Sequence, residues 1–173
     1  KRVLYPWYEE RLKDSRETHG AITGGYTNNN VVSMDQIDLD KQGRVHLFLI
    51  REMREVLQWW CQMRLRHTST FGLRIYKRGS MLINHLDIDS SHLASAVIQV
   101  GQEVDKDGGW PLEVMNPDGS GDLSEVYLQP GEMVLYEGAR LKHGRPMRFK
   151  GKEFGNIFSH FAPVDWRGPA TGW

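Results

Sequence analysis

The chain has 173 residues, of which 39% are hydrophobic, and this is enough to bury one substantial core at the usual size of a single domain. Its 22 lysines and arginines balance its 22 aspartates and glutamates, so no overall field attracts nucleic acid or an anionic membrane. The single cysteine excludes an internal disulfide, and no stretch approaches the ~20 apolar residues that cross a bilayer. We predict one domain over residues 1–173, while compartment and oligomeric state stay open.

The first 42 residues are predicted to form an arm and a loop region. Aromatic and charged residues are interleaved up to about Arg16, and Gly, Asn and Asp dominate from Thr18 to Gln42. Long loops in compact domains often act as lids or binding loops. The segment from Gly20 to Asp40 is therefore a candidate lid.

Residues 44–66 carry the pattern of one long amphipathic helix. Apolar residues recur at spacings of three and four, and the charged residues fall mainly on the other face. We expect this helix to brace the outside of a sheet. The apolar positions are Val45, Phe48, Leu49, Met53, Val56, Leu57, Trp60 and Met63.

From residue 72 to 162, short apolar runs alternate with turn residues, before a predicted tail at 163–173. Such a pattern predicts a mainly β fold, either a barrel or a double-sheet jelly roll. The runs that indicate strands are Leu73 to Lys77, Met81 to Leu86, Ala94 to Val100, Pro111 to Val114, Val126 to Leu128, Met133 to Tyr136 and Asn156 to Phe161.

Two residues, His85 near the end of the predicted strand Met81 to Leu86 and Asp87 just after it, indicate a candidate metal site. Residues i and i+2 of an extended segment share a face, so this imidazole and this carboxylate aim at one point. If His143 comes from a later strand of the same barrel, the three form a 2-His-1-carboxylate facial triad, which suits non-haem Fe(II). A local alternative is a metal site within residues 85–92, in which Asp89 replaces Asp87 and His92 replaces His143.

Further residues surround this triad in a fixed order. Those residues are Tyr76 and Gly79 before His85, then Gly108-Gly109, Pro130-Gly131-Glu132 and, after His143, Pro146 and Lys152. From about Leu73 to Ala162 the set resembles the prolyl 4-hydroxylase group of Fe(II)/2-oxoglutarate-dependent oxygenases. The resemblance implies a double-stranded β-helix (jelly roll) with one major bracing helix and an N-terminal loop-rich arm.

The resemblance also implies which residues bind the cofactors. By it, His85, Asp87 and His143 bind Fe(II), Lys152 pairs with the distal carboxylate of 2-oxoglutarate, and Tyr76 donates its hydroxyl to that carboxylate. A dicarboxylate needs a fixed cation at its far end, which agrees with a Lys or Arg there. Within the basic run that ends at Lys152, three other cations are rivals for this role, namely Arg145, Arg148 and Lys150.

The last predicted strand offers residues for the substrate. If Lys152 points inward and the strand stays extended, Phe154, Asn156, Phe158 and His160 share its face. The resembling hydroxylases carry an aromatic residue and a histidine near their peptide substrate, which implies Phe158 and His160 as substrate contacts. Packing of the barrel interior is the alternative role for both.

The resemblance implies hydroxylation coupled to the conversion of 2-oxoglutarate and O2 to succinate and carbon dioxide, with ascorbate as a candidate reductant. A prolyl residue in a peptide or protein is the expected substrate. Leu82 stands where these hydroxylases often have a tyrosine, and Trp110-Pro111 replaces their usual polar turn. The alternatives are therefore an oxygenase acting on another side chain or a small molecule, and a jelly-roll module that binds a metal or sugar without turnover.

Overall fold

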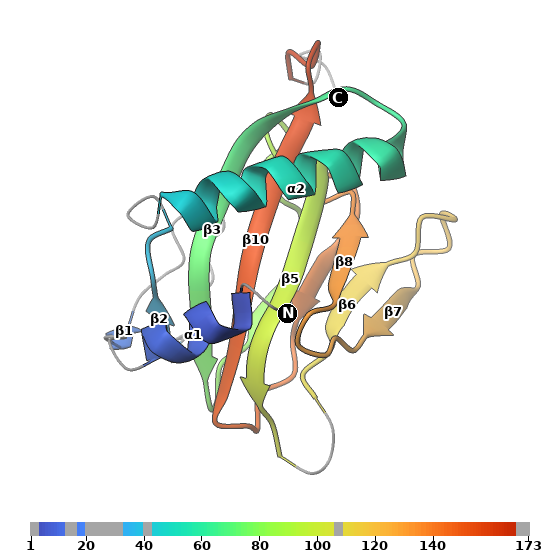
Figure 1. The fold of residues 1–173 in the computed structure, drawn as a ribbon. Helices are drawn as coiled ribbons and strands as arrows, with labels where there is room; N and C mark the ends of the chain where they lie inside the picture. The colour runs from blue at the N-terminus through green and yellow to red at the C-terminus, as the bar shows by residue number, and fades with distance from the viewer. Residues whose placement is uncertain (1–3, 13–16, 20–32, 40–42, 106–108, 169–173) are drawn as a thin grey trace.

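The computed structural model describes residues 4–12, 17–19, 33–39, 43–105 and 109–168 (Figure 1). Two helices and ten strands lie in this part of the chain. Their bounds are α1 (Leu4–Leu12), β1 (Glu17–His19), β2 (Ser33–Gln36), α2 (Arg44–Cys61), β3 (Leu65–Lys77), β4 (Leu82–His85), β5 (Ala94–Glu103), β6 (Leu112–Met115), β7 (Leu123–Val126), β8 (Met133–Tyr136), β9 (His143–Arg145) and β10 (Glu153–Pro163).

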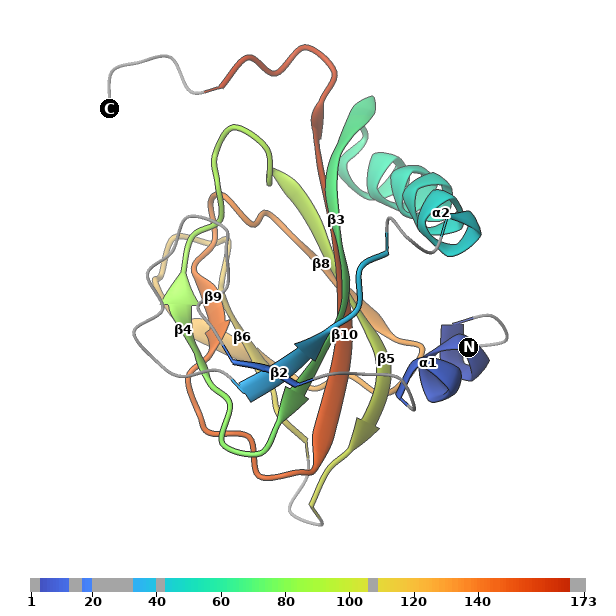
Figure 2. The same cartoon turned by 90° about the vertical axis from the view of Figure 1, so that its left-hand side faces the viewer.

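The strands form two antiparallel sheets that face each other. The larger sheet has the order β1-β2-β3-β10-β5-β8, and the smaller has the order β4-β9-β6-β7. The long strands β3, β10 and β5 make the middle of the larger sheet, and the smaller sheet lies opposite them (Figure 2). This arrangement confirms the predicted jelly roll.

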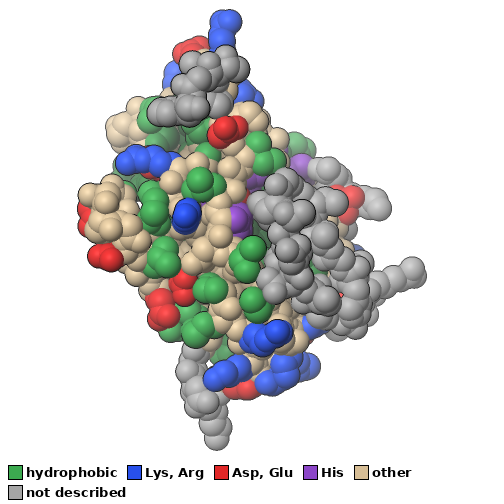
Figure 3. All heavy atoms as spheres, turned by 180° about the vertical axis from the view of Figure 1, so that it is seen from behind, with side chains coloured by type: hydrophobic (Ala, Val, Ile, Leu, Met, Phe, Trp, Pro, Cys, Tyr) green, Lys and Arg blue, Asp and Glu red, His purple; other side chains and the backbone are tan. Residues whose placement is uncertain are grey.

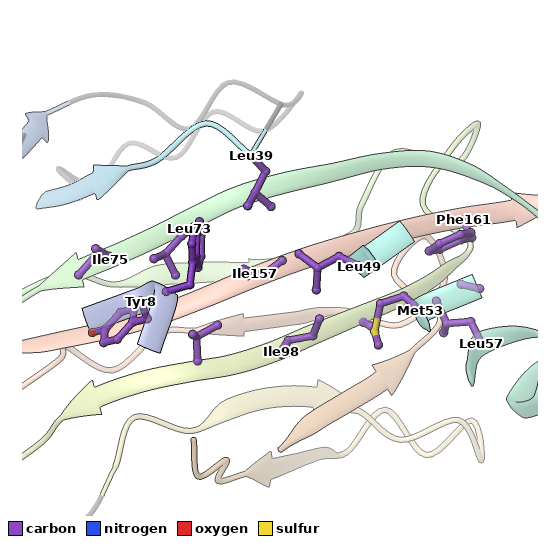
Figure 4. Packing of buried hydrophobic residues seen from close by; sticks show 14 of the residues in the cluster. Tyr8, Leu39, Leu49, Met53, Leu57, Leu73, Ile75, Ile98, Ile157 and Phe161 are labelled. Atoms are coloured by element: carbon purple, nitrogen blue, oxygen red, sulfur yellow. The ribbon is translucent and has the colours of Figure 1, made fainter. Parts of the chain in front are cut away.

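Helix α2 covers the outer face of the larger sheet, as the sequence predicts for a bracing helix (Figures 1 and 2). Its inner face buries Leu49, Met53 and Leu57. These side chains pack in one cluster with Ile157 and Phe161 of β10 (Figure 4). Each fully buried side chain of this kind contributes about 1.5–3 kcal/mol, so the cluster fixes the long central strands from behind.

The helix ends at Cys61 rather than at the predicted Arg66. Gln62 adopts a left-handed backbone conformation with φ of 55°, which terminates the helical hydrogen-bond pattern. The Gln58 side chain then accepts a hydrogen bond of 2.9 Å from the Leu65 backbone N–H. The chain is thereby directed into β3, which begins well before the predicted start at Leu73.

Strand β10 separates the helix side of the larger sheet from the space between the sheets. Ile157 and Phe161 face the helices, whereas Phe158 and His160 line the interior pocket. Adjacent residues of a strand point to opposite faces of the sheet, which predicts that Phe158 and Ile157 lie on different sides of β10. The interior face of β10 is therefore the part of the core that is available to a site.

Some sequence predictions concern residues that the structure does not describe. Most of the candidate lid, residues 20–32 and 40, lies outside the described residues, although β2 (Ser33–Gln36) is a strand within the predicted loop. Neither of the two described helices has the length and apolar character needed to cross a membrane.

Candidate metal centre and its pocket

Two short strands of the smaller sheet bring the three predicted ligands together. His85 is the last residue of β4, and His143 is the first residue of β9. The antiparallel register of these strands places His85 directly opposite His143. Asp87 follows β4, and one ligand atom from each of the three residues lies within 4.8 Å of the others. The structure thus assembles the group that the sequence predicts.

Both imidazoles are held in the tautomer that a metal ion requires. Nδ1 of His85 donates a hydrogen bond of 2.8 Å to the Ile83 carbonyl, and Nδ1 of His143 donates one of 2.9 Å to the Leu141 carbonyl. Each Nε2 is therefore left with a lone pair. His85 Nε2 lies 3.7 Å from Asp87 Oδ1, and His143 Nε2 lies 3.5 Å from Asp87 Oδ2. Backbone acceptors of this kind fix ligand histidines before the metal binds.

Asp87 is a buried carboxylate that lacks a full set of partners. Only 9% of the residue is exposed, and its Oδ2 has no hydrogen-bond partner among the described residues. Burial by itself raises the pKa of Asp87, but interactions with His143 and His85, in their protonated forms, outweigh burial and hold that pKa well below its usual range. A buried anion needs a compensating cation. Two imidazoles and one carboxylate are a donor set that fits a divalent metal ion such as Fe(II).

Two glycines leave room for this arrangement. A Cβ atom on Gly138 would lie 2.3 Å from Asp87 Oδ2, and a Cβ atom on Gly144 would lie 2.5 Å from the Asn84 side-chain oxygen. Contacts this short require the carboxylate or the paired strands to move. The backbone at these two positions is thus part of the site.

A narrow pocket extends from the triad into the space between the sheets. Two arginines, Arg74 and Arg145, line it together with Tyr76, Phe71, Phe158 and His160. In the surface view from the side opposite α2, histidine side chains are visible near the middle of the face (Figure 3). The pocket therefore combines a candidate metal centre, two cations and an aromatic wall.

Arg145 and Tyr76 both line this pocket and both pack against the Trp110 ring. Arg145 is 2% exposed and donates hydrogen bonds to the Trp110 carbonyl at 2.9 Å and to Asn156 Oδ1 at 3.2 Å. Its guanidinium lies 5.2 Å from the centroid of the Trp110 ring, against which Tyr76 also packs at 5.2 Å. The buried Tyr76 hydroxyl has no hydrogen-bond partner in the described part of the chain.

The charge state of Arg145 suits an anion. Burial lowers the pKa of Arg145 to about 10, so the guanidinium remains protonated at neutral pH. A buried guanidinium beside a free hydroxyl donor matches the charge-assisted hydrogen bonds that a carboxylate accepts.

The structure does not bring Lys152 into the pocket. Lys152 precedes β10, its side chain is 68% exposed, and its Nζ forms an ion pair of 2.9 Å with Glu103. Arg148 and Lys150 are also exposed, so Arg145 is the one member of the basic run that faces the triad. Residues i and i+2 of a strand share a face, so Arg145 lies on the same face of β9 as His143. This alternation is the sequence signal that could have distinguished Arg145 from the other cations of the basic run.

The structure places Phe158 and His160 in the pocket wall. Ser95 Oγ forms a hydrogen bond of 2.8 Å with His160 Nδ1, and the His92 ring stacks on the His160 ring with centroids 3.8 Å apart. Burial and then the neighbouring His92 lower the pKa of His160 well below its ordinary value. His160 is therefore a neutral hydrogen-bonding group.

The structure also shows the position of the residues of the local alternative and of one residue, Arg74, that the sequence did not single out. The metal-ligand cluster found in the described part of the chain contains neither Asp89 nor His92, which the local alternative would use. Arg74 had no sequence signal beyond its place two residues before Tyr76, which puts the two side chains on one face of β3.

No protein-family model matches the sequence, and no curated protein matches it. Solved structures do match the fold. A prolyl-4-hydroxylase from Pseudomonas putida has a TM-score of 0.65 at 17% identity, covering 94% of this chain and 85% of that chain. A Trichoplax adhaerens prolyl hydroxylase in complex with a hypoxia inducible factor peptide has a TM-score of 0.62 at 12% identity, covering 91% and 76%.

The third structure, HygX from Streptomyces hygroscopicus with nickel and 2-oxoglutarate bound, has a TM-score of 0.61 at 12% identity, covering 95% and 80%. The similarity to these three proteins is a similarity of fold. It agrees with the resemblance to the prolyl 4-hydroxylase group that the motifs indicate.

Proposed function

We propose that the protein is an Fe(II)- and 2-oxoglutarate-dependent hydroxylase. The carrying observation is the triad His85, Asp87 and His143, whose two Nε2 atoms face a buried carboxylate that has an unpartnered oxygen. Such a triad would hold Fe(II) through three protein ligands and would leave room for a chelating 2-oxo acid and for oxygen. The shared fold with 2-oxoglutarate oxygenases supports the same reaction class.

In this proposal Arg145 and Tyr76 bind the distal carboxylate of 2-oxoglutarate. Arg145 takes the role that the sequence resemblance gave to Lys152, because Arg145 is buried beside the triad whereas Lys152 is exposed and paired with Glu103. The Tyr76 hydroxyl supplies a second donor. Together they fix the cosubstrate at the end remote from the metal ligands.

When bound, the iron would supply oxygen activation coupled to decarboxylation of 2-oxoglutarate, with ascorbate as a candidate reductant. The chain itself supplies geometry and charge. The triad orients the metal, Arg145 and Tyr76 orient the cosubstrate, and the aromatic wall with Phe158 limits access of water.

For the substrate we propose a prolyl residue in a peptide, contacted by Phe158 and by the neutral His160. The similarity in fold to two prolyl hydroxylases supports this choice. A small molecule is the second candidate, because the pocket has a second buried arginine and because the fold also matches HygX solved with hygromycin B.

The test is succinate formation from 2-oxoglutarate with Fe(II), O2 and ascorbate, followed by mass spectrometry of proline-containing peptides for a gain of one oxygen. We expect succinate from the wild type and from Lys152→Gln, and none from Asp87→Ala. A binding module without turnover would form no succinate in any variant, and a wild type that neither binds nor decarboxylates 2-oxoglutarate would contradict the proposal.

A further inference from the structure

Arg74 is a second buried cation that the proposed function leaves without a role. It is 5% exposed, and its guanidinium carbon lies 5.2 Å from the centroid of the Phe71 ring and 5.3 Å from that of the Phe158 ring. Its Nε has no hydrogen-bond partner, and no carboxylate forms an ion pair with it among the described residues. A largely buried arginine with no acceptor for its Nε is costly, so this side chain is suited to an anion that arrives from outside.

The side chain of Asn156, the polar neighbour of Arg74, already has hydrogen-bond partners of its own. Asn156 lies opposite Arg74 in the register of β3 and β10. The Asn156 side-chain oxygen accepts from Arg145, and its amide nitrogen donates to Gln99. Asn156 therefore positions the cation proposed for 2-oxoglutarate and offers Arg74 no acceptor.

The two arginines also lie in different surroundings. Arg145 lies against Trp110 and Phe154, beside Tyr76. Arg74 lies between Phe71 and Phe158, and Phe71 in turn contacts the His160 ring at 5.6 Å. The second cation thus belongs to the aromatic side of the pocket, where the substrate contacts are proposed.

The balance of charge in the pocket indicates what the second cation binds. Arg74 and Arg145 are its cationic side chains, and Asp87 is its one carboxylate among the described lining residues. A divalent metal ion adds two positive charges, and 2-oxoglutarate brings two negative ones. One positive charge then remains uncompensated in a site of low dielectric, which favours a substrate with a single negative charge.

We propose that Arg74 binds a carboxylate of the primary substrate, with the adjoining part of that substrate packed against the aromatic wall of the pocket that Phe71 and Phe158 form beside Arg74. The inference rests on the proposed function and narrows its substrate class to carboxylic acids. For the prolyl candidate, the carboxylate belongs to the prolyl residue itself, so the target is a C-terminal prolyl residue and not an internal one.

Matched acids and amides test this directly, because each pair differs by one charge at nearly constant shape. The probes are N-acetylproline with N-acetylprolinamide and benzoate with benzamide, titrated calorimetrically into protein saturated with Ni(II) and 2-oxoglutarate. We expect each acid to bind at least about 10-fold more tightly than its amide, as a desolvated charge-assisted pair provides. Equal affinities, or no binding of either acid at millimolar concentration, would overturn the proposal.

Variants assign the effect to Arg74. In Arg74→Gln the preference for the acid is expected to disappear, while the affinity for 2-oxoglutarate changes by less than about 3-fold. Lys152→Gln, which removes an exposed cation outside the pocket, is expected to keep the full preference. An acid preference that survives in Arg74→Gln would contradict the role of Arg74. If Arg74→Gln folds poorly, Arg74→Met can replace it, because methionine keeps the packed aliphatic part of the side chain without the charge. The comparison of acid and amide affinities in the wild type requires no variant.

The outcome is distinguishable from failure of the proposed function. If the wild type does not bind 2-oxoglutarate, the hydroxylase proposal fails, whereas the acid and amide pairs can still be titrated into protein without cosubstrate. If 2-oxoglutarate is decarboxylated but the acids show no advantage, the hydroxylase proposal stands and the carboxylate proposal fails.

Discussion

At the scale of single residues, the proposed site depends on side chains whose partners are incomplete. Asp87 Oδ2, the Tyr76 hydroxyl and Arg74 Nε are all buried and lack hydrogen-bond partners among the described residues. Buried polar groups are normally satisfied, so each such atom is a place where a ligand lowers a desolvation cost. The three residues that carry these atoms line one pocket, which argues for a single site with several components.

Replacing Arg145 is expected to weaken cosubstrate binding selectively. Arg145→Gln should raise the dissociation constant of 2-oxoglutarate by about 10–100-fold, because the buried carboxylate loses a charge-assisted partner. The measurement is a calorimetric titration of Ni(II)-loaded protein. Lys152→Gln is the matched control, and we expect less than about 2-fold change because surface ion pairs contribute little. A larger effect from Lys152→Gln than from Arg145→Gln would return the role to Lys152.

The Tyr76 hydroxyl should contribute less than Arg145. Tyr76→Phe keeps the buried ring against Trp110 and removes one neutral donor. Loss of such a hydrogen bond corresponds to about 0.5–1.5 kcal/mol, so we expect the affinity for 2-oxoglutarate to fall about 2- to 12-fold. Unchanged affinity in the same titration would show that the hydroxyl does not contact the cosubstrate.

At the scale of elements, the site depends on short strands and turns that bring distant residues together. Alternation along a strand was enough to predict that His85 and Asp87 share a face, and that Phe158 and His160 point away from Ile157. The strand β9 (His143–Arg145) was not predicted, because three residues with a central glycine carry no hydrophobic pattern. The pairing of β4 with β9 is a long-range contact, and only the structure shows that it sets His85 opposite His143.

The turn at Gly138 should tolerate no side chain. In Gly138→Ala the added methyl would lie 2.3 Å from Asp87 Oδ2, so the carboxylate must move. We expect metal affinity to fall by about 10–100-fold, the usual effect of disturbing the support of metal ligands. Competition with a chelating dye measures this affinity. Arg140→Ala, at an exposed position of the same turn, is the control and should bind metal as the wild type does.

The packing of helix α2 should contribute to the free energy of unfolding, separately from the residues of the candidate metal centre. Leu57 is fully buried against the larger sheet, so Leu57→Ala is expected to lower the free energy of unfolding by about 2–5 kcal/mol. Trp59 on the same helix is 73% exposed, and Trp59→Ala should change this free energy by less than about 0.5 kcal/mol. Urea unfolding followed by circular dichroism measures both variants. Similar losses from the two would contradict the packing of α2 described above.

At the scale of the whole molecule, order along the chain predicted the fold and the candidate triad, but it did not predict which residue of the basic run lines the pocket. The sequence placed a helix before a series of short strands, and the structure shows that helix across the outer face of the larger sheet (Figure 1). The family resemblance implied Lys152, but the bend before β10 leaves Lys152 in solvent. The direction of a side chain at a strand end depends on tertiary pairing, which residue spacing alone does not determine.

The most direct test of the central claim is release of labelled carbon dioxide from 2-oxoglutarate labelled at its first carbon. We predict turnover with Fe(II) and O2, loss of turnover when a chelator removes the metal, and recovery when Fe(II) is restored in excess. Asp87→Ala should stay inactive under all three conditions, because the buried carboxylate of the triad is gone. Turnover that is absent from the Fe(II)-loaded wild type, or that persists after complete removal of the metal, would contradict the account.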